Sequence, residues 1–297
     1  MPTAPTVGTS VPRREGVEKV TGAARYTDDL RFSGAWYGAT IRSTVPRGRL
    51  RGVTLDPAFD WSRVVVVTAQ DIPGDNVVQL IQDDQPALAE DQIRHREEPV
   101  VLIAAPDIET LAAARAHVKL DQERLDPVLD IESATQVFST VEIAKGDVDA
   151  GLKGADLVIE RQFRVGLQEQ LYIEPQAVIA MPWRETGDGI RDTGVTVYGS
   201  LQCPFYVHRA LKRALGLGDS QVRVIQAETG GGFGGKEEYP SMLAIHAALL
   251  ARKAGRPVRL IYDRHEDLAA TTKRHPGIVT HRTGVTKDGA LVAQDIE

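Results

Sequence analysis

The residues best suited to chemistry lie in one glycine-rich segment. Residues 230–237 read GGGFGGKE, between a strand predicted over 222–227 and a helix predicted over 239–253. Five glycines in these eight positions let the backbone approach a ligand closely, with peptide N–H groups pointing outwards and a helix N-terminus behind them. This geometry suits an anion or an oxo group. The simpler alternative is a flexible tight turn.

A phosphate loop is the first functional interpretation of these glycines. Gly230, the four residues after it, Gly235 and Lys236 match the Walker A pattern up to its last position. That position requires a Ser or Thr hydroxyl to hold magnesium, whereas Glu237 would place a carboxylate beside phosphate charge. The sequence therefore argues against a nucleotide hydrolase.

A dinucleotide site is the second interpretation. Gly230, Gly232 and Gly235 satisfy G-x-G-x-x-G after a strand and before a helix, and Asp263 ends the next predicted strand. However, this unit starts only after residue 220, and Phe233 is bulky where the backbone would meet a pyrophosphate. An NAD(P)-dependent dehydrogenase that uses the 230–235 loop is kept as the alternative.

The elements that must position this loop predict an α+β fold, because short strands alternate with few helices. The clearest helix before residue 127 can be capped by Asp107 and has Glu109 in its first turn. The predicted helices cover 107–117, 204–215 and 239–253. The predicted strands cover 36–42, 51–55, 64–68, 99–104, 118–120, 157–165, 177–183, 195–200, 222–227, 256–262 and 291–296.

A polar, acidic segment interrupts this pattern and ends in Lys145-Gly146-Asp147. Such a change of character is typical of a domain boundary. The expected organisation is an N-terminal extension over 1–16, a first domain over 17–127, a linker over 128–150 and a second domain over 151–297.

Composition excludes several classes of function. The formal net charge of -6 comes from 41 acidic and 35 basic side chains without a block of like charges, which disfavours nucleic acid and anionic membranes as partners. A single cysteine, Cys203, leaves too few thiolates for a disulfide framework, an iron–sulfur cluster or a structural zinc site. No apolar run approaches the roughly 18 residues of a membrane span, and the N-terminus lacks a secretory core. We therefore expect a cytoplasmic protein.

The glycine segment also resembles the cofactor loop of the molybdenum-binding subunit in the xanthine dehydrogenase and aldehyde oxidase family. Seven further stretches are similar to motifs of that family and follow in the same order: residues 19–29, 42–43, 71–74, 145–147, 172–175, 255–258 and 274–276. One such match would be weak, whereas eight in register identify the family. The resemblance implies an N-terminal α/β hammerhead domain followed by the first part of a molybdopterin-binding α+β domain.

The resemblance implies roles for particular residues. Gln202 matches a glutamine that hydrogen-bonds near the molybdenum oxygen ligands, and an amide can donate there without adding charge. The backbone amide of Phe233 is expected to face the molybdenum centre, although its ring alone could fill space behind the loop. The expected cofactor-binding residues are Gln202, Gly231, Gly232, Phe233 and Gly234, of which Gln202 and Phe233 lie near the metal through its ligands.

Glu237 is the candidate catalytic residue. In xanthine-type members, the glutamate at this position binds the purine and assists proton movement, which suits a carboxylate that can accept from a ring N–H group. The plain alternative is an acidic residue in the first turn of a helix, favoured by the helix dipole.

The implied reaction is hydroxylation of a carbon next to a ring nitrogen or a carbonyl, with oxygen from water and electrons leaving through molybdenum. The substrate would be a purine, another N-heteroaromatic or an aldehyde. The implied cofactor is molybdenum–molybdopterin, in the cytosine dinucleotide form if the chain is bacterial, and iron–sulfur clusters and FAD would lie on partner subunits.

The chain stops at Glu297, inside the run predicted as a strand over 291–296, whereas family members continue for several hundred residues. The family's catalytic base and a substrate-orienting arginine lie in those later segments. We therefore expect a truncated product or a split subunit completed by a C-terminal polypeptide, and an isolated chain without activity. Two departures, Gln170 in place of a histidine and 96–99 in place of a glycine-containing stretch, leave the substrate open.

Overall fold

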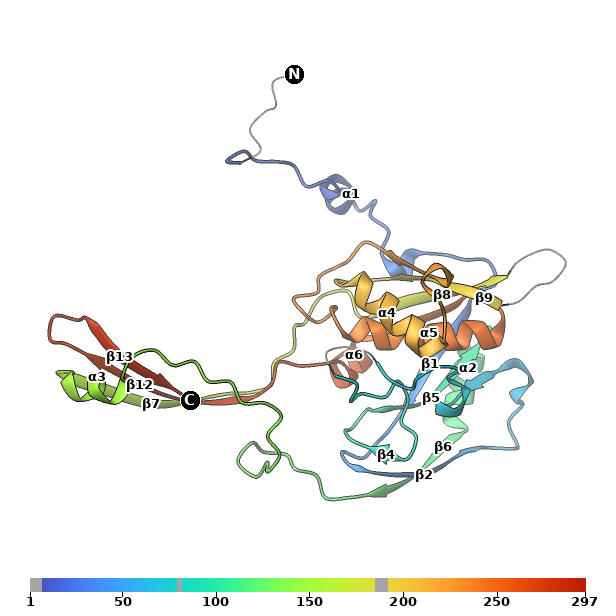
Figure 1. Cartoon of the computed structure of the whole chain (residues 1–297). Coiled ribbons are helices and arrows are strands. Elements are labelled where there is room, and N and C mark those ends of the chain that lie inside the picture. The colour runs from blue at the N-terminus through green and yellow to red at the C-terminus, as the bar shows by residue number, and fades with distance from the viewer. Residues whose placement is uncertain (1–6, 79–81, 185–191) are drawn as a thin grey trace. The chain divides into compact units, whose positions relative to one another are not determined.

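The computed structural model describes residues 7–78, 82–184 and 192–297 (Figure 1). The chain divides into two compact units. The first unit consists of Met1–Leu125 and Leu171–Thr271, and the second of Asp126–Gln170 and Thr272–Glu297. Each unit is therefore assembled from two separate stretches of the chain.

A seven-stranded mixed sheet forms the centre of the first unit. Its strands are β1 (Trp36–Arg42), β3 (Val65–Val67), β5 (Pro99–Ala105), β8 (Ala177–Arg184), β9 (Asp192–Gly199), β10 (Val222–Gln226) and β11 (Val258–Ile261). They lie in the order β10-β9-β8-β11-β1-β5-β3, and β11 pairs in parallel with β1 and antiparallel with β8. Strands from both sides of the predicted linker at 128–150 are therefore neighbours in one sheet. The domain boundaries themselves stay a prediction.

Two helices cover one face of this sheet (Figure 1): α4 (Pro204–Leu215) and α5 (Tyr239–Ala254). The other face carries α2 (Ile108–Ala116) and a small sheet of β4 (Gln92–Ile93), β2 (Gly48–Leu55) and β6 (Val118–Arg124). Alternate residues of β5 serve the two faces, since Leu102 packs in the cluster with α4 and α5 and Ile103 in the cluster with α2. Helices on both faces of a mixed sheet confirm the α+β prediction.

Capping residues explain why the predicted helices were placed well. Pro204 stands in the first turn of α4, and Gly216 ends it with a left-handed φ of 63°. The side chain of Asp107 caps α2 by accepting a hydrogen bond from the Thr110 amide over 2.7 Å. The helix predicted over 204–215 coincides with α4, and those over 107–117 and 239–253 agree with α2 and α5 to one residue at either end.

Short helices were not predicted, because six or seven residues are too few to show a hydrophobic repeat. These are α1 (Gly16–Thr21), α3 (Val148–Gly154) and α6 (Arg264–Ala270). The described residues also form single turns of 3-10 helix at Thr27–Asp29, Trp61–Arg63, Ala69–Asp71 and Asp219–Gln221. Within the described residues, no helix is both long and apolar enough to span a membrane.

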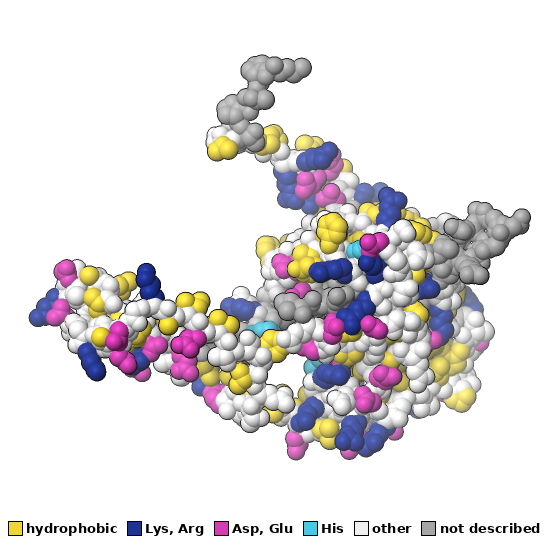
Figure 2. All heavy atoms as spheres, viewed as in Figure 1, with side chains coloured by type: hydrophobic (Ala, Val, Ile, Leu, Met, Phe, Trp, Pro, Cys, Tyr) yellow, Lys and Arg dark blue, Asp and Glu magenta, His cyan; other side chains and the backbone are white. Residues whose placement is uncertain are grey.

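The second unit is a three-stranded antiparallel sheet with α3. Its strands lie in the order β13 (Leu291–Ile296), β12 (Gly277–Val285) and β7 (Leu157–Val165), and β12 was not predicted. The strand predicted over 291–296 therefore pairs with β12 along one edge. Among the described residues of this unit no hydrophobic side chain is fully buried, and Figure 2 shows apolar side chains on its surface.

Candidate functional site

The glycine segment connects β10 to α5 with an unusual backbone. Gly231, Phe233 and Gly234 have left-handed φ angles of 99°, 51° and 91°. Phe233 is not a glycine, so this conformation marks it as a position held by its surroundings. Its side chain is 77% exposed, so the ring does not fill space behind the loop.

Several backbone N–H groups of this loop make no hydrogen bond within the described residues. The amides of Gly231, Gly232 and Phe233 have no hydrogen-bond acceptor among the residues that the structure describes. Successive amides in alternating backbone conformations form a concavity that attracts anions and oxo groups. The loop can therefore present three adjacent donors to a ligand.

Gln202 crosses to this loop from the segment after β9. Its Oε1 accepts from the backbone amides of Gly234 (3.1 Å) and Lys236 (3.2 Å), and the backbone N–H of Gln202 donates to the Lys236 carbonyl over 2.7 Å. These bonds fix the orientation of the side-chain amide, because only its oxygen can accept. The Nε2 group has no partner within the described part of the chain and the side chain is exposed, so Gln202 offers donors outwards.

Close packing explains the glycine at position 232. A Cβ atom added to Gly232 would overlap Oε1 and Cδ of Gln202. Any larger residue would have to displace the Gln202 side chain from the two loop amides. A side chain at position 232 is therefore incompatible with the observed position of the Gln202 side chain.

The segment Tyr172–Gln176 forms the floor under the loop. The Gln176 Nε2 group donates to the Tyr172 hydroxyl (2.8 Å) and to the Gly235 carbonyl (2.7 Å). A Cβ atom on Gly235 would overlap the ring of Tyr172, so the loop packs closely against that ring at this residue. Burial raises the pKa of the Tyr172 hydroxyl, which therefore stays protonated at neutral pH.

A second layer of contacts holds this floor. The Arg264 guanidinium donates to the carbonyl groups of Tyr172 (2.6 Å) and Ile173 (2.7 Å), and the Asp267 carboxylate accepts from the backbone N–H of Gln176 over 2.6 Å. Both residues belong to α6. The contact between the 172–175 motif and the glycine loop could not be predicted, because nothing local in the sequence shows it.

Lys236 does not face a ligand. Its side chain is fully buried, and Nζ donates to Glu174 Oε2 (3.1 Å) and to Ser200 Oγ (2.8 Å). A Walker A lysine must reach bound phosphates, so the position of this ammonium agrees with the rejection of a phosphate loop.

The dinucleotide interpretation is not favoured by the sheet. In a dinucleotide-binding unit, the strands before and after the helix are neighbours, whereas β9 and β8 separate β10 from β11. Asp263 is also engaged elsewhere, since its carboxylate caps α6 by accepting from the Glu266 amide over 2.7 Å. The alternative of a nicotinamide-dependent dehydrogenase is therefore dropped.

Glu237 is exposed and precedes α5, whose first residue is Tyr239. It does not lie in the first turn of that helix, so the plain alternative of a first-turn acidic residue does not describe it. Burial raises the pKa of the Cys203 thiol, and the nearby carboxylates of Glu237 and Glu238 raise it further. The structure thus gathers Gln202, Gly231–Gly234 and Glu237 around one loop.

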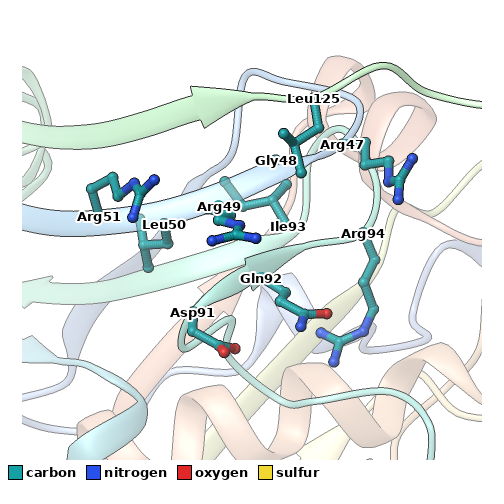
Figure 3. Close-up of a pocket in the computed structure, with 10 residues that line it drawn as sticks. All are labelled: Arg47, Gly48, Arg49, Leu50, Arg51, Asp91, Gln92, Ile93, Arg94 and Leu125. Carbon is teal, nitrogen blue, oxygen red and sulfur yellow. The ribbon is translucent and has the colours of Figure 1, made fainter.

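A cavity of about 670 Å³ lies beside β2 and β4 (Figure 3). Four exposed arginines line it, but Arg51 forms an ion pair with Glu123 and Arg94 one with Glu98. The lining residues are Arg47, Gly48, Arg49, Leu50, Arg51, Asp91, Gln92, Ile93, Arg94 and Leu125. None of the predicted site residues is among them, so we assign the candidate site to the glycine loop.

Two family models together match most of the chain. Residues 21–126 match the family model described as the a/b hammerhead domain of aldehyde oxidase and xanthine dehydrogenase. Residues 131–297 match the model of the molybdopterin cofactor-binding domain.

Two relatives align with nearly the whole chain. The nicotinate dehydrogenase large molybdopterin subunit of Eubacterium barkeri is 32% identical over 95% of this chain and 67% of its own length. The xanthine dehydrogenase of Emericella nidulans is 30% identical over 98% of this chain. The chain spans only 22% of the length of that second relative.

Solved structures share the fold. CO dehydrogenase from Oligotropha carboxidovorans superimposes with a TM-score of 0.81 at 22% identity, over 97% of this chain and 39% of that one. Quinoline 2-oxidoreductase from Pseudomonas putida 86 gives 0.81 at 23% identity, over 99% of this chain and 39% of that one. By its family models and relatives, the chain belongs to the xanthine dehydrogenase and aldehyde oxidase family of molybdenum hydroxylases.

Proposed function

We propose that the chain provides one wall of a molybdenum–molybdopterin site in a hydroxylase. The observation that carries this proposal is a set of donors without an acceptor among the described residues, namely the exposed Gln202 side-chain amide and the adjacent backbone N–H groups of Gly231, Gly232 and Phe233. When bound, the cofactor supplies a two-electron oxidation that uses oxygen from water.

The donor set fits the oxygen-rich surroundings of such a cofactor. Neutral amides can donate to oxo or phosphate oxygens without adding charge and without competing as metal ligands. Gln202 and Gly231–Gly234 would hold the group, and the Glu174, Gln176 and Tyr172 contacts would keep these donors in place before the cofactor arrives. Donors that are already oriented lose little entropy on binding.

We assign Glu237 to the substrate. Its exposed carboxylate lies at the end of the same loop, where it can accept from the ring N–H of a purine or another N-heteroaromatic, or hold a proton. Aldehydes offer no ring nitrogen, so they would be bound without this contact. The proposed substrate is therefore an N-heteroaromatic, with aldehydes as the second class.

The wider assembly is part of the same proposal. Electrons would pass to iron–sulfur and FAD partner subunits. If the molybdenum subunit is split, a C-terminal polypeptide would supply the base and the substrate-orienting arginine. A cytosine dinucleotide form of the cofactor and a cytoplasmic location complete the proposal. The alternative is an incomplete subunit without activity, which a complex free of molybdenum would favour.

Two substitutions at position 202 test the donor role in a complex reconstituted with its partner subunits. In Gln202→Glu, a carboxylate oxygen still accepts from the Gly234 and Lys236 amides, but the outward NH₂ donors are lost. Gln202→Ala removes both functions. We expect both variants to lower turnover on the order of 10²-fold, more than they change substrate affinity, since one donor to a reacting centre contributes about that much.

Gln70 is exposed in the same unit, so Gln70→Glu is the control for the effect of adding a negative charge. Molybdenum and pterin content are measured beside turnover, so that loss of cofactor is separated from loss of chemistry. Normal turnover in Gln202→Glu would show that Gln202 only supports the loop.

A further inference from the structure

We infer that Lys236 and Glu174 are positioning residues, a buried ion pair that ties both ends of the glycine loop to its floor. The first contact point is Gly230, which opens the loop, and the second is Lys236, which nearly closes it. The consequence for a bound cofactor rests on the proposed function, whereas the ion pair itself does not.

One carboxylate oxygen makes the connection. Glu174 Oε2 accepts from the Gly230 amide (2.7 Å), from Ser200 Oγ (2.6 Å) and from Lys236 Nζ (3.1 Å). Lys236 Nζ also donates to Ser200 Oγ over 2.8 Å. A shift of either end of the loop would therefore break a bond to the same carboxylate.

The backbone of Lys236 links this ion pair to Gln202. The Lys236 backbone N–H donates to Gln202 Oε1, and the Lys236 carbonyl accepts from the backbone N–H of Gln202. The side chain of Lys236 is bonded to Glu174, and its backbone is bonded to Gln202. The ion pair therefore also helps to set the orientation of the Gln202 side-chain NH₂ group.

The free energy of burying a lysine indicates that Lys236 positions the loop and does not mainly contribute packing. Lysine is almost never fully buried, and an apolar side chain of similar volume commonly gives equal or better stability than a buried ion pair. Burial lowers the pKa of Lys236, and the Glu174 carboxylate opposes that shift. The Tyr172 ring adds a cation–π contact at 4.6 Å, which helps to hold the ammonium over the floor.

Hydrogen exchange of individual loop amides tests the inference in the full chain without cofactor. The amides of Gly230, Gly234 and Lys236 are bonded and should report on the ion pair. The unbonded amides of Gly231–Phe233 provide an internal reference. We expect Lys236→Met to speed exchange at the three bonded positions about tenfold or more, with the reference amides and those of β5 unchanged.

Glu174→Gln provides a second variant, since its amide oxygen still accepts from Gly230 while the charge is lost. If Lys236→Met fails to fold, this variant and the double variant carry the same measurement. Lys253→Met is the matched control, because Lys253 pairs with Asp71 on the surface over 2.6 Å. Selective acceleration at the bonded loop amides supports the inference. Uniform acceleration that includes β5, or none, would overturn it in favour of a purely stabilising ion pair.

A second readout separates this inference from the proposed function. In the reconstituted complex, the ion-pair variants should lower turnover more than substrate affinity, as displaced donors would. Molybdenum absent from the wild-type complex would refute the proposed function and leave the exchange result standing. Molybdenum present with unchanged loop exchange in the variants would refute only the positioning role.

Discussion

Two backbone amides of the loop donate to the side-chain oxygen of Gln202. The chemistry of this residue therefore depends on its side-chain NH₂ group. Within the described residues, the NH₂ group is the part of the Gln202 side-chain amide that has no partner, so this amide is set to donate to a ligand. Phe233 has a left-handed backbone and an exposed ring, and its amide has no acceptor among the described residues. What each residue of this site can offer a ligand depends on which of its polar atoms already make hydrogen bonds within the protein.

Glu237 should act selectively on substrates. We expect Glu237→Ala to impair oxidation of purine-type substrates by roughly 2 to 4 kcal/mol in kcat/KM and to spare simple aldehydes, because only the heteroaromatic ring loses a charged hydrogen bond. The measurement is a pair of steady-state assays on the reconstituted complex. Glu238→Ala controls for loss of charge beside the loop, and equal losses on both substrate classes would instead indicate a structural role.

Because of His246, we expect the stability of the first unit to fall at acid pH. It is fully buried in α5, where burial lowers its pKa to about 3, and Nε2 donates to the Ala87 carbonyl over 2.8 Å. The unfolded chain takes up this proton near pH 6.5, so stability is intact above that pH and falls as the pH drops from 6.5 towards 3. At pH 5 this group alone should cost about 2 kcal/mol of unfolding free energy.

Urea unfolding at pH 7.5 and pH 5 measures this effect. His246→Gln keeps a donor for the Ala87 carbonyl and cannot titrate in this range, so it should flatten the pH dependence. His265→Gln, at an exposed position, should leave it unchanged. An identical pH slope in wild type and His246→Gln would contradict the assignment.

Among the elements, those with strong local signals could be predicted and those defined by distant contacts could not. Helix α4 follows from Pro204 and Gly216, and β7 from its alternating side chains. The strand order could not be predicted, because β11 reaches β1 across more than 200 residues of sequence. Lys236 was missed for the same reason: its burial depends on Glu174 and Ser200, which only the fold brings near.

The glycine loop should tolerate substitution according to its neighbours. A side chain at position 232 collides with Gln202, whereas one at Gly52 in β2 meets open space. We therefore expect Gly232→Ala to lower the free energy of unfolding by about 1 to 3 kcal/mol and to reduce molybdenum retention, while Gly52→Ala stays within about 0.5 kcal/mol. Urea unfolding and metal analysis decide this. A stable Gly232→Ala variant that retains metal would mean that Gln202 can move without consequence.

On the scale of the whole molecule, the first unit depends on strands that are far apart in the chain. β1 has β5 on one side and β11 on the other, so a fragment that ended within the predicted linker would lose one neighbour of a central strand. The residues under the loop, Tyr172–Gln176, also come after that linker. The site and the sheet that carries it are therefore products of both predicted domains, and neither can be argued from one of them alone.

The second unit should need a protein partner. All nine residues of β7 are exposed and the strand is outermost in its sheet, and large apolar side chains such as Phe163, Leu291 and Ile296 are exposed as well. An apolar surface beside an open strand edge is a binding surface or an aggregation hazard. We therefore expect the chain expressed alone to self-associate, and co-expression with a polypeptide resembling the family's remaining cofactor segments to give a soluble complex.

Size-exclusion chromatography with light scattering measures this at micromolar concentration. Phe163→Lys places a charge in the apolar surface of β7 and should increase the monomer fraction of the chain alone while weakening the complex. Lys153→Ala, in α3 of the same unit, is the control, because it removes a charge without touching β7. If the wild-type chain were a monodisperse monomer that ignored the candidate polypeptide, the exposed face of β7 would have to be an ordinary solvated surface.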